Sequence, residues 1–419
     1  MSISKNSVRL ANRSGNNSYK RGLSRRNGAP WRIADRRPPV LSFKILHIVI
    51  SQRQEESMLL INNQEVERLL DMKACLEALE DGYDDLLKGD AVYRPRLDLW
   101  MPCDRPDGYW RWGTMEGASR KIGVFAIRMK SDVVYWPNGD TEEKYCMQPG
   151  TWCGLVMVFS VRNGEPLAII NDGLLQHMRV GGCAGLGVKY LAREDACDVG
   201  IFGSGGMARS YLEAFYEVRK LKRVRVYSPT KANREAFARE MTGKLDLEVV
   251  AVDAPEKVVR EADIVATCTD STRTVFDEAE WLKEGAHITC VRACEVGPKV
   301  IQRCDLSVKL GKNTIEAMDE GMVRLHGNVG YIAGQPEERS RIPNPTVDNY
   351  KGDYFKYFMD VRAGKVPGRI NNKQITFFIN AGTQGLQFAA CAGKVVELAK
   401  QKKVGRELPT EWFLQDIRD

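Results

Sequence analysis

The feature that most constrains the fold of this sequence is a glycine-rich turn between a strand and a helix. Residues 198–202 form a mostly apolar run typical of a buried strand, and they lead directly into Gly203-Ser204-Gly205-Gly206-Met207-Ala208. A helical pattern then continues to about residue 219. This G-x-G-x-x-A spacing, after a strand and before a helix, is the context in which a turn binds the pyrophosphate of a dinucleotide. We predict that residues 203–208 bind such a cofactor, the alternative being a glycine turn with a structural role only.

Three positions of the turn require a small residue, each for a different physical reason. Gly203 permits the tight turn, Gly205 lets the backbone approach the pyrophosphate, and Ala208 allows the helix to pack closely on the strand. The amide groups at the helix N-terminus then face the phosphates. Further strands are expected at residues 223–228, 247–252, 264–269, 286–292 and 306–310, with helices between several of them. Strands that alternate with helices predict an α/β domain with a Rossmann-type, doubly wound parallel sheet.

The residues before this domain follow a different pattern. Residues 59–61 are typical of a short strand, and Asn62 or Asn63 is expected to cap a helix that ends near Leu87. Alternating apolar residues predict an antiparallel sheet with strands at 94–101, 109–114, 124–129, 152–160 and 166–170, and helices are expected over 174–191 and 383–401. We therefore expect a dinucleotide-binding domain at 181–325 and an α+β substrate-binding and dimerisation domain that is split between 58–180 and 326–419.

Residues 1–57 differ from the rest of the chain in charge. They hold twelve of the 62 Lys and Arg but only three of the 55 Asp and Glu, so the remaining residues carry 50 basic against 52 acidic side chains. We expect this basic segment to be a disordered extension. It is either an organelle transit peptide or sequence upstream of a natural start at Met58, and the second interpretation is favoured because a well-patterned segment begins there. We then expect a cytoplasmic protein.

Composition and spacing exclude several classes of protein. The basic residues outside the extension neither cluster nor alternate with aromatic residues, as a nucleic-acid-binding face would require. No apolar run reaches the roughly 18–20 residues that span a bilayer, so we expect no membrane partner. The eleven cysteines are scattered without a C-x-x-C pair, and the four histidines lack metal-binding spacing. We therefore expect free thiols, a reducing compartment and no metal site.

The end of the second strand of the dinucleotide domain bears on the choice of cofactor. NAD sites have an acidic residue here that binds the ribose 2′-hydroxyl. This chain instead has Ser228, Thr230 and Lys231, with Arg234 one turn later. Hydroxyl groups with nearby cations suit a 2′-phosphate, so we predict that NADP(H) is preferred over NAD(H). If Lys231 and Arg234 are only solvated helix charges, the protein accepts both cofactors.

Five stretches together resemble the ornithine cyclodeaminase/mu-crystallin family, with the resemblance running from about residue 59 to residue 404. They are residues 94–96 (Arg-Pro-Arg), 174–191, 203–208, 262–269 and 285–289. The family includes cyclodeaminases, ketimine and imine reductases, alanine dehydrogenase-like enzymes and opine-type synthases, and its substrates are mostly small α-amino or α-imino carboxylates. The resemblance implies a nicotinamide cofactor that Thr269 also contacts, a small amino- or imino-acid substrate, and a homodimer.

The resemblance also implies which residues bind the substrate. Arg96 and Arg179 match positions that hold its carboxylate, for which a planar guanidinium is well suited. Where the family usually has a lysine, this chain has Arg128, and Lys130 lies two residues further on the same strand face. Either residue would polarise the imine, although an arginine does not readily release a proton.

Two further positions depart from the cyclodeaminases. Where these enzymes have an aspartate proposed to act on the substrate amine, this chain has Cys294 by direct alignment, or Glu295 if one residue is inserted. We take Glu295 as the candidate proton donor or relay. In the last expected helix, Gln387 stands where relatives often have an aspartate. The aromatic residues at 109–112 and 135–136 are more typical of a core or a subunit contact than of a substrate pocket.

These departures favour a one-way reductase or dehydrogenase over ornithine cyclodeaminase itself. We predict an NAD(P)H-dependent oxidoreductase that reduces an imine or ketimine, or oxidatively deaminates a small amino acid. Two alternatives stay open. One is an ammonia-releasing cyclodeaminase that recycles its NAD, and the other is a non-catalytic protein that binds NADPH and a small ligand or serves as an accessory subunit of an amine oxidase. The sequence does not identify the substrate or the direction of the reaction.

Overall fold

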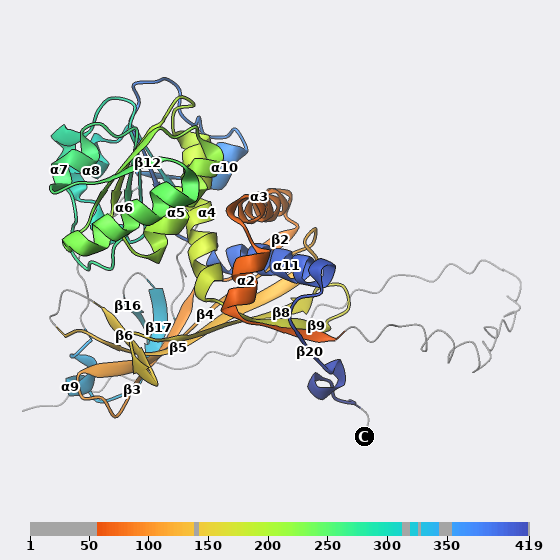
Figure 1. The fold of residues 1–419 in the computed structure, drawn as a ribbon. Coiled ribbons are helices and arrows are strands. Elements are labelled where there is room, and N and C mark those ends of the chain that lie inside the picture. Colours follow the sequence, from red (N-terminus) through yellow and green to blue (C-terminus); the bar gives the residue numbers. More distant parts are fainter. Residues whose placement is uncertain (1–56, 138–141, 312–318, 326–327, 343–353, 418–419) are drawn as a thin grey trace, which may run out of the picture. The chain divides into compact units, whose positions relative to one another are not determined.

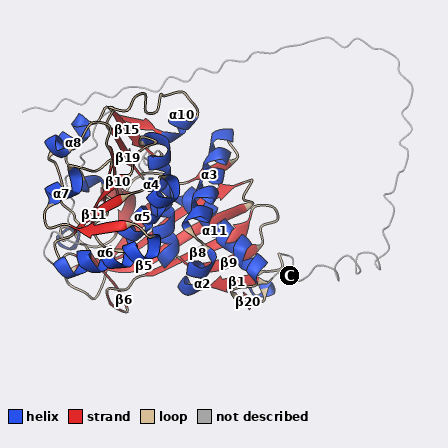
Figure 2. Ribbon diagram, turned by 45° about the horizontal axis from the view of Figure 1, so that its top comes forward, coloured by secondary structure: helices blue, strands red, loops and turns tan. Residues whose placement is uncertain are grey.

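The computed structural model describes residues 57–137, 142–311, 319–325, 328–342 and 354–417. The predicted basic extension at 1–57 lies outside the described residues except for Ser57, so its character and the expected cytoplasmic location stay predictions. The described residues form two β-sheets (Figure 1). Figure 2 shows the strands of both sheets in red and the helices packed on them in blue.

The first sheet has twelve strands and is mostly antiparallel, as the alternation of apolar residues predicts. Its main path runs in the order β16-β17-β3-β4-β5-β8-β9-β1-β20, and two of its pairs, β1 with β9 and β17 with β3, are parallel. The strands of this path are β1 (Met58–Ile61), β3 (Leu97–Pro102), β4 (Gly108–Ser119), β5 (Val124–Tyr135), β8 (Cys153–Ser160), β9 (Pro166–Asn171), β16 (Met322–Leu325), β17 (Asn328–Ile332) and β20 (Arg406–Leu408). Short strands pair beside it, namely β2 (Ala91–Tyr93), β6 (Glu143–Cys146) and β7 (Gln148–Pro149).

Three helices cover one face of this sheet (Figure 1), namely α2 (Asn63–Leu69), α3 (Met72–Lys88) and α11 (Gln384–Lys402). The sequence predicts one continuous helix in place of α2 and α3. Asn62 caps α2, as predicted, by accepting a hydrogen bond from the backbone N–H of Glu65. Asp71 accepts a hydrogen bond from the backbone N–H of Ala74 and so begins a second helix. The apolar period continues through this break, which is why periodicity alone did not reveal it.

The two faces of the first sheet differ in their surroundings. Along β5, buried and partly exposed residues alternate without exception. Val124 and Ala126 belong to the core that includes α3 and α11, and the opposite face presents apolar side chains that are only partly covered, such as Phe125, Met129 and Phe159. The aromatic stretch on β4 is divided between the faces: Tyr109 is buried in a small cluster, and Trp110 is partly exposed on the uncovered face.

The second sheet has eight strands, and every neighbouring pair in it is parallel. The order is β12-β11-β10-β13-β14-β19-β15-β18. The strands are β10 (Asp198–Phe202), β11 (Arg223–Tyr227), β12 (Glu248–Ala251), β13 (Ile264–Thr267), β14 (His287–Cys290), β15 (Leu306–Lys309), β18 (Phe355–Tyr357) and β19 (Thr376–Ile379). This sheet confirms the predicted Rossmann-type α/β fold.

Helices cover both faces of the second sheet, as a doubly wound fold requires. Helices α5 (Gly206–Val218) and α6 (Lys231–Leu245) bury one apolar cluster against it, and α7 (Pro255–Val259) and α8 (Pro298–Arg303) bury another on the opposite face. The remaining short helices are α9 (Pro336–Arg339), α10 (Phe358–Arg362) and the 3₁₀ turns η1 (Ala279–Trp281), η2 (Ala293–Glu295) and η3 (Thr410–Phe413).

The strands near the C-terminus do not follow the predicted division of the chain. The sequence assigns all of 326–419 to the substrate domain, but β18 and β19 lie in the second sheet, with β19 between β14 and β15. Conversely, β16 lies in the first sheet although its residues precede the predicted boundary. A four-residue apolar run such as that of β19 does not reveal which sheet it joins. The domain boundaries themselves stay a prediction.

Helix α4 (Gly173–Leu191) follows the first sheet and packs closely against the second. A Cβ atom at Gly181 would lie 2.5 Å from the carbonyl oxygen of Ser210 on α5. A Cβ atom at Gly187 would lie 2.4 Å from the ring of Phe378 on β19. These two glycines therefore let α4 approach α5 and β19 more closely than a larger residue would permit. The close packing fixes α4 to both α5 and the second sheet.

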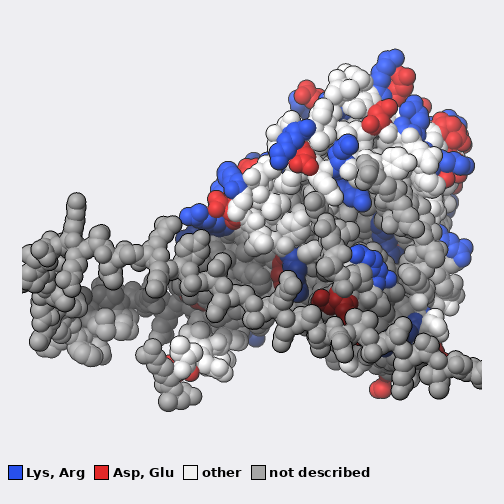
Figure 3. All heavy atoms as spheres, turned by 180° about the vertical axis from the view of Figure 1, so that it is seen from behind, with Lys and Arg blue, Asp and Glu red and all other residues white. Residues whose placement is uncertain are grey.

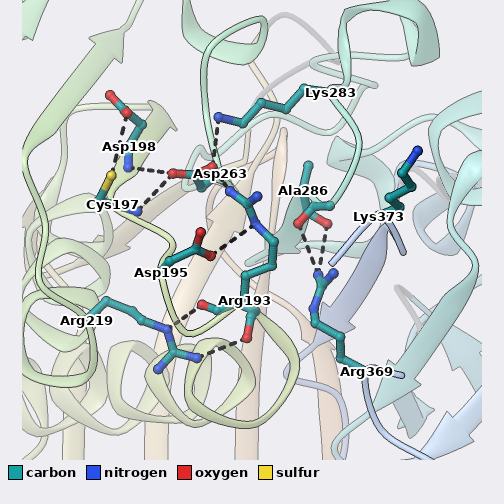
Figure 4. A network of polar contacts seen from close by, with 12 residues as sticks. Arg193, Asp195, Cys197, Asp198, Arg219, Asp263, Lys283, Ala286, Arg369 and Lys373 are labelled. Atoms are coloured by element: carbon teal, nitrogen blue, oxygen red, sulfur yellow. Dashed lines mark hydrogen bonds and ion pairs between the residues drawn. The ribbon is translucent and has the colours of Figure 1, made fainter. Parts of the chain in front are cut away.

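Two arginines cap the C-terminal end of α4 (Figure 4). Arg219 donates hydrogen bonds to the carbonyl oxygens of Val188 and Arg193, and Arg369 donates one to the carbonyl oxygen of Leu191. The last carbonyl groups of a helix lack partners within the helix and attract cations. The two guanidinium groups satisfy them and fix the position at which α4 ends.

A buried carboxylate beside these arginines joins β10 to β13 (Figure 4). Asp263 accepts hydrogen bonds from the backbone N–H groups of Cys197 and Asp198, at 2.9 and 3.0 Å, and it pairs with Lys283 at 2.7 Å and with Arg193. Burial raises the pKa of Asp263, but Lys283 and the two N–H groups outweigh this effect and lower it below its usual value. Although Cys197, Asp198 and Asp263 lie close enough to share a metal ion, Asp263 is already occupied.

On the face seen in Figure 3, basic and acidic side chains are interspersed over the upper part of the molecule instead of forming a patch of one sign. This mixture agrees with the balanced charge of the sequence after residue 57. None of the described helices combines the length and the apolar character that crossing a lipid bilayer requires.

Candidate active site

The glycine-rich turn lies where the strand order of the second sheet reverses. β10 leads into the turn and has β11 on one side and β13 on the other. The chain therefore builds outward from β10 in one direction through β11 and β12, and then in the other through β13 and β14. Such a reversal leaves a crevice at the carboxyl ends of the strands, where ligands bind in doubly wound folds.

The geometry of the turn explains its small residues. Gly203 has a φ of 101°, in the left-handed region, and a Cβ atom there would lie 2.2 Å from the carbonyl oxygen of Cys268. Gly205 is the N-cap of α5, and no atom lies within 4 Å of the position that a Cβ atom would occupy. Ala208 is fully buried. The turn therefore leaves open space against the first amides of a helix, which suits a phosphate group.

The loops after β10 and β11 are tied together. The hydroxyl oxygens of Ser204 and Ser228 lie 3.0 Å apart, and the Ser228 hydroxyl also donates to the carbonyl oxygen of Thr230 at 3.3 Å. Arg234 donates from Nη1 to the carbonyl oxygens of Ser228 and Pro229, at 2.8 and 3.2 Å. Ser228 and Thr230, the two predicted cofactor residues before α6, thus belong to one ordered loop, with Arg234 folded back onto it.

A cavity of about 340 Å³ adjoins this loop, between the start of α6 and the end of β12. Its lining contains the cations Lys231, Arg234 and Lys257 and the acids Glu235 and Asp253. Lys231 is 76% exposed and lies 3.8 Å from Glu235, and Lys257 lies 2.8 Å from Asp253. Exposed pairs of this kind are weak, so the two lysines are available to a more strongly charged ligand.

Glu295 is fully buried below the loops that follow β13 and β14. Its carboxylate accepts hydrogen bonds from the backbone N–H groups of Thr269, Val291 and Arg292, at 2.7, 3.1 and 2.8 Å. It also accepts hydrogen bonds from the hydroxyl groups of Thr267 and Thr269, at 3.1 and 2.6 Å. Both oxygens are therefore occupied by the chain itself, although burial outweighs these donors and raises the pKa of Glu295. The occupied oxygens favour a structural role for Glu295 over the predicted role as a proton donor or relay. Thr269, a predicted cofactor contact, donates hydrogen bonds to this carboxylate from both its backbone N–H and its hydroxyl group.

Cys294 is the other candidate for the aspartate position of the cyclodeaminases. It is partly buried next to Glu295, and its Sγ donates to the carbonyl oxygen of Ser271 at 3.5 Å. Burial raises the pKa of the Cys294 thiol, so the thiol is protonated at neutral pH. Neither residue supplies an unoccupied carboxylate at this position.

Three arginine side chains occupy the side of the first sheet that faces α4 and α11. The Nε of Arg96 donates to Asp98 at 2.7 Å, and the Nε of Arg128 donates to Asp172. The guanidinium of Arg179 projects from α4. Two of their nitrogen atoms, Nη2 of Arg96 and Nε of Arg179, are buried and have no hydrogen-bond partner among the described residues. Buried donors of this kind are costly unless a ligand accepts from them.

Arg179 is held by neutral groups. It donates from Nη1 to Gln387 at 2.8 Å and from Nη2 to Gln176 at 2.7 Å, and no acid among the described residues pairs with it. Burial lowers the pKa of Arg179 to about 10. The guanidinium groups of Arg179 and Arg128 lie 4.8 and 5.7 Å from the ring centre of Phe388. Among the described residues, Arg179 thus forms no direct ion pair and lies close to Arg128, while the one nearby carboxylate, Asp172, pairs with Arg128. Two cations share one acid, and the site favours a further anion.

Lys130 lies on the same face of β5 as Arg128, as the strand period predicts. Its Nζ is 2.8 Å from Asp132, which also accepts from Arg111 at 3.2 Å. Burial and the charge of Arg111 lower the pKa of Lys130 well below its ordinary value. Burial opposes ionisation of Asp132, but Arg111 and Lys130 hold its pKa well below the usual range. Lys130 is therefore a buried amine that releases its proton more readily than an ordinary lysine.

Glu142 connects the first sheet to the loops of the second. Its carboxylate lies 3.5 Å from Arg111 on β4 and 3.9 Å from Arg292, in the loop after β14. Lys144 lies 3.8 Å from the same carboxylate. The sequence did not single out Glu142 because it stands in a polar stretch without periodicity, and only the pairing of β6 with β5 reveals its position.

His177 is a second residue that the sequence did not single out. Its ring lies against the first residue of α5, since a Cβ atom at Gly206 would lie 2.7 Å from the ring Cε1. His177 precedes Arg179 by two positions on α4. One helix therefore reaches the glycine-rich turn and the arginine site together.

A model of the ornithine cyclodeaminase/mu-crystallin family matches residues 55–403. The chain is 27% identical over 257 residues to a Delta(1)-pyrroline-2-carboxylate reductase of Bacillus cereus, a match that covers 61% of this chain and 74% of the relative. It is 26% identical over 351 residues to an alanine dehydrogenase of Archaeoglobus fulgidus, covering 84% and 98%. The solved structure of the Thermococcus litoralis Delta(1)-pyrroline-2-carboxylate reductase with NADH and L-proline superimposes with a TM-score of 0.65 and 25% identity, over 84% of this chain and all of that one.

Proposed function

Because this chain belongs to the ornithine cyclodeaminase/mu-crystallin family, we propose that it is an NAD(P)H-dependent oxidoreductase that acts on C–N bonds. It reduces an imine or ketimine of a small α-imino acid, or oxidatively deaminates the corresponding amino acid. The observation that carries the proposal is that Arg96 and Arg179 each keep a buried guanidinium nitrogen without a partner among the described residues, and that Arg179 lies on the part of α4 that also reaches the glycine-rich turn. One helix thus joins a carboxylate site to a dinucleotide site.

The described residues fit a nicotinamide dinucleotide. The open space at Gly205 and the first amides of α5 suit its pyrophosphate, and the loop of Ser228 and Thr230 lies at the end of β11, where the adenine ribose is held in this fold. Relatives support the same group, since the Thermococcus litoralis reductase was solved with NADH. When bound, the nicotinamide supplies the hydride for the imine carbon.

The remaining part of the reaction belongs to the chain. Arg96 and Arg179 bind the substrate carboxylate through the donors that they leave free, and so fix the imine carbon relative to the cofactor site. Arg128, held by Asp172, keeps its positive charge and polarises the imine. A complete reduction of C=N also needs one proton on nitrogen.

We assign that proton to Lys130. Arg128 does not release a proton readily, and the carboxylate of Glu295 is occupied by five hydrogen bonds. The lowered pKa of Lys130 makes its ammonium group a stronger proton donor than that of an ordinary lysine. Asp132 holds the ammonium group in place and keeps its ion pair with Arg111 when Lys130 becomes neutral.

Preference for NADP(H) over NAD(H) remains part of the proposal. Its support is the group of three cations, Lys231, Arg234 and Lys257, that line the cavity at the end of β11 and β12, where no acid replaces Ser228. The Michaelis constants for NADPH and NADH test it. A tenfold lower constant for NADH would contradict the preference and leave the rest of the proposal intact.

We also propose that the protein is a homodimer formed through the uncovered face of the first sheet. Apolar side chains on this face, including Trp110, Phe125 and Met129, are only partly buried within one chain. Large apolar side chains that remain partly exposed on one face of a sheet are typical of an interface between subunits. Sedimentation velocity at micromolar concentration should give a dimer, and Phe125→Glu should give a monomer. A monomeric wild-type protein would contradict the proposal.

The test of the activity is consumption of NADPH at 340 nm with a panel of imino acids, formed from 2-oxo acids and amines or supplied as cyclic ketimines. Loss of absorbance with one class of imine would support a reductase and identify the class. Release of ammonia from ornithine or lysine without a net change at 340 nm would favour the cyclodeaminase instead. Binding of NADPH without turnover on any substrate would favour a ligand-binding protein.

A further inference from the structure

We infer that His177 is a further cofactor-binding residue, which contacts a phosphate of the dinucleotide at the glycine-rich turn and takes up a proton when the cofactor binds. The inference rests on one element of the proposed function, namely that a nicotinamide dinucleotide binds at residues 203–208. It is independent of the substrate and of the assignment of Lys130.

The position of the ring is the first observation. The atoms Cε1, Nδ1 and Nε2 of His177 lie 2.7, 3.0 and 3.1 Å from the place that a Cβ atom of Gly206 would occupy. The imidazole therefore packs against the first residue of α5, next to the open position at Gly205. A phosphate on the first amides of α5 would lie beside this ring. The contact also explains why residue 206 is a glycine, although the G-x-G-x-x-A pattern does not require one there.

The free hydrogen-bonding capacity of the ring is the second observation. Among the described residues, neither nitrogen of His177 has a hydrogen-bond partner. The side chain is partly exposed, and neither ring nitrogen belongs to the buried polar atoms that lack a partner among the described residues. Both nitrogens are therefore accessible to a ligand that enters the open space at Gly205.

The charges that face the ring are the third observation. They are the cations Arg179 on α4, Arg209 on α5 and Lys144 on β6. Two acids lie close to these cations. Glu240 on α6 pairs with Arg209, which also donates to the carbonyl oxygen of Ser204 at 2.8 Å, and Glu142 lies 3.8 Å from Lys144. Burial and these cations lower the pKa of His177, so the ring is neutral in the free protein at neutral pH. Of the three cations, Arg179 alone forms no ion pair with an acid among the described residues, so cations still exceed acids around the ring.

A bound pyrophosphate opposes the effect of these cations on the protonation of His177. Its negative charges favour the imidazolium form, which donates a charge-assisted hydrogen bond to a phosphate oxygen. The pKa of His177 is thus higher in the complex than in the free protein, and binding takes up a proton between the two values. The affinity for the cofactor is therefore highest at low pH and falls as the pH rises through the pKa of the complex.

The experiment is a calorimetric titration of the full chain with NADH at pH 6.5, 7.5 and 8.5, in pairs of buffers with different ionisation enthalpies. NADH is the main probe because its pyrophosphate stays fully ionised in this range, whereas the 2′-phosphate of NADPH titrates near pH 6. Wild-type protein should take up a measurable fraction of a proton per NADH bound. His177→Gln keeps a neutral donor and should abolish the uptake.

The same titrations give the affinities. A charge-assisted hydrogen bond to a phosphate corresponds to roughly tenfold to a hundredfold in affinity, so His177→Gln should weaken NADH binding by at least about tenfold at pH 6.5 and by much less at pH 8.5. Lys189→Ala, at the other end of α4 and 43% exposed, is the matched control and should bind NADH as the wild type does.

The possible outcomes distinguish a failure of the proposed function from a failure of the inference about His177. If the wild type binds neither NADH nor NADPH, the proposed function fails. If it binds NADH without proton uptake, or if His177→Gln keeps the wild-type affinity and pH dependence, the inference about His177 is overturned and the proposed function stands. The proton uptake of the wild type needs no variant, so the inference is tested even if a substitution at His177 prevents folding.

Discussion

Replacing Asp263 by alanine should destabilise the fold by removing a carboxylate that nothing else replaces. The side chain is 4% exposed and accepts from two backbone N–H groups while it pairs with Lys283 and Arg193. Removal of one partner from a buried ion pair costs about 3–5 kcal/mol, because the other charge is left unpaired. Here the cations are 20% and 33% exposed, so water reaches them and the lower end of the range applies. We expect a loss of about 3 kcal/mol in the free energy of unfolding at pH 7.

The effect should also depend on pH. The pKa of Asp263 is lowered in the folded protein, so the stabilisation is fully present above the unfolded-state pKa of about 3.9 and is lost as the pH falls through the folded-state pKa. The difference between the wild type and Asp263→Ala should therefore shrink in acid. Urea unfolding followed by tryptophan fluorescence measures both quantities.

The neighbouring carboxylate provides a matched control for this experiment. Asp195 lies 3.6 Å from the same Arg193 but is 71% exposed, and Asp195→Ala should change the stability by less than about 0.5 kcal/mol. A loss below about 1 kcal/mol for Asp263→Ala, or a loss equal to that of the control, would refute the view that this network joins β10 to β13.

Three further predictions concern the site. Gly205→Ala should leave the melting temperature unchanged, because its φ is −88° and no atom obstructs the new methyl group, but it should weaken NADPH binding at least about tenfold; unchanged binding would place the pyrophosphate elsewhere. Lys130→Met should slow imine reduction about a hundredfold or more and remove the fall in rate at alkaline pH, which in the wild type follows deprotonation of this lysine; an unaltered pH profile would assign the proton to another group. Arg96→Ala should raise the KM for a carboxylate substrate about tenfold to a hundredfold without changing NADPH binding, and an unchanged KM would remove Arg96 from the site.

The parts of the fold that are specified locally were predictable from the sequence. Strand β10 spans the predicted residues 198–202, and α5 begins within the glycine-rich turn, because the glycines, the strand and the helix are adjacent in the chain. Strand β19 was missed for the opposite reason. Its four residues become a central strand only by pairing with β14 and β15, which lie far away in the sequence.

The site shows the same distinction between local and distant information. The resemblance led to Arg96, Arg128 and Arg179, whose residue type already indicates binding of an anion. The residue type of Glu295 did not indicate its role. A glutamate that accepts five hydrogen bonds from the chain and a glutamate that acts as a catalytic acid look alike in a sequence. Glu142 depends on contacts across the sheets for its meaning.

Helix α4 limits which parts of the site can change in proteins with this fold. It carries His177 and Arg179 two residues apart, which corresponds to about 3 Å along the helix axis, and its glycines and terminal arginines prevent it from sliding. The distance between the glycine-rich turn and the guanidinium of Arg179 is therefore fixed by α4. New substrate preferences must therefore arise on β4 and β5, at positions other than Arg128 and Lys130, where a side chain can change without altering this spacing.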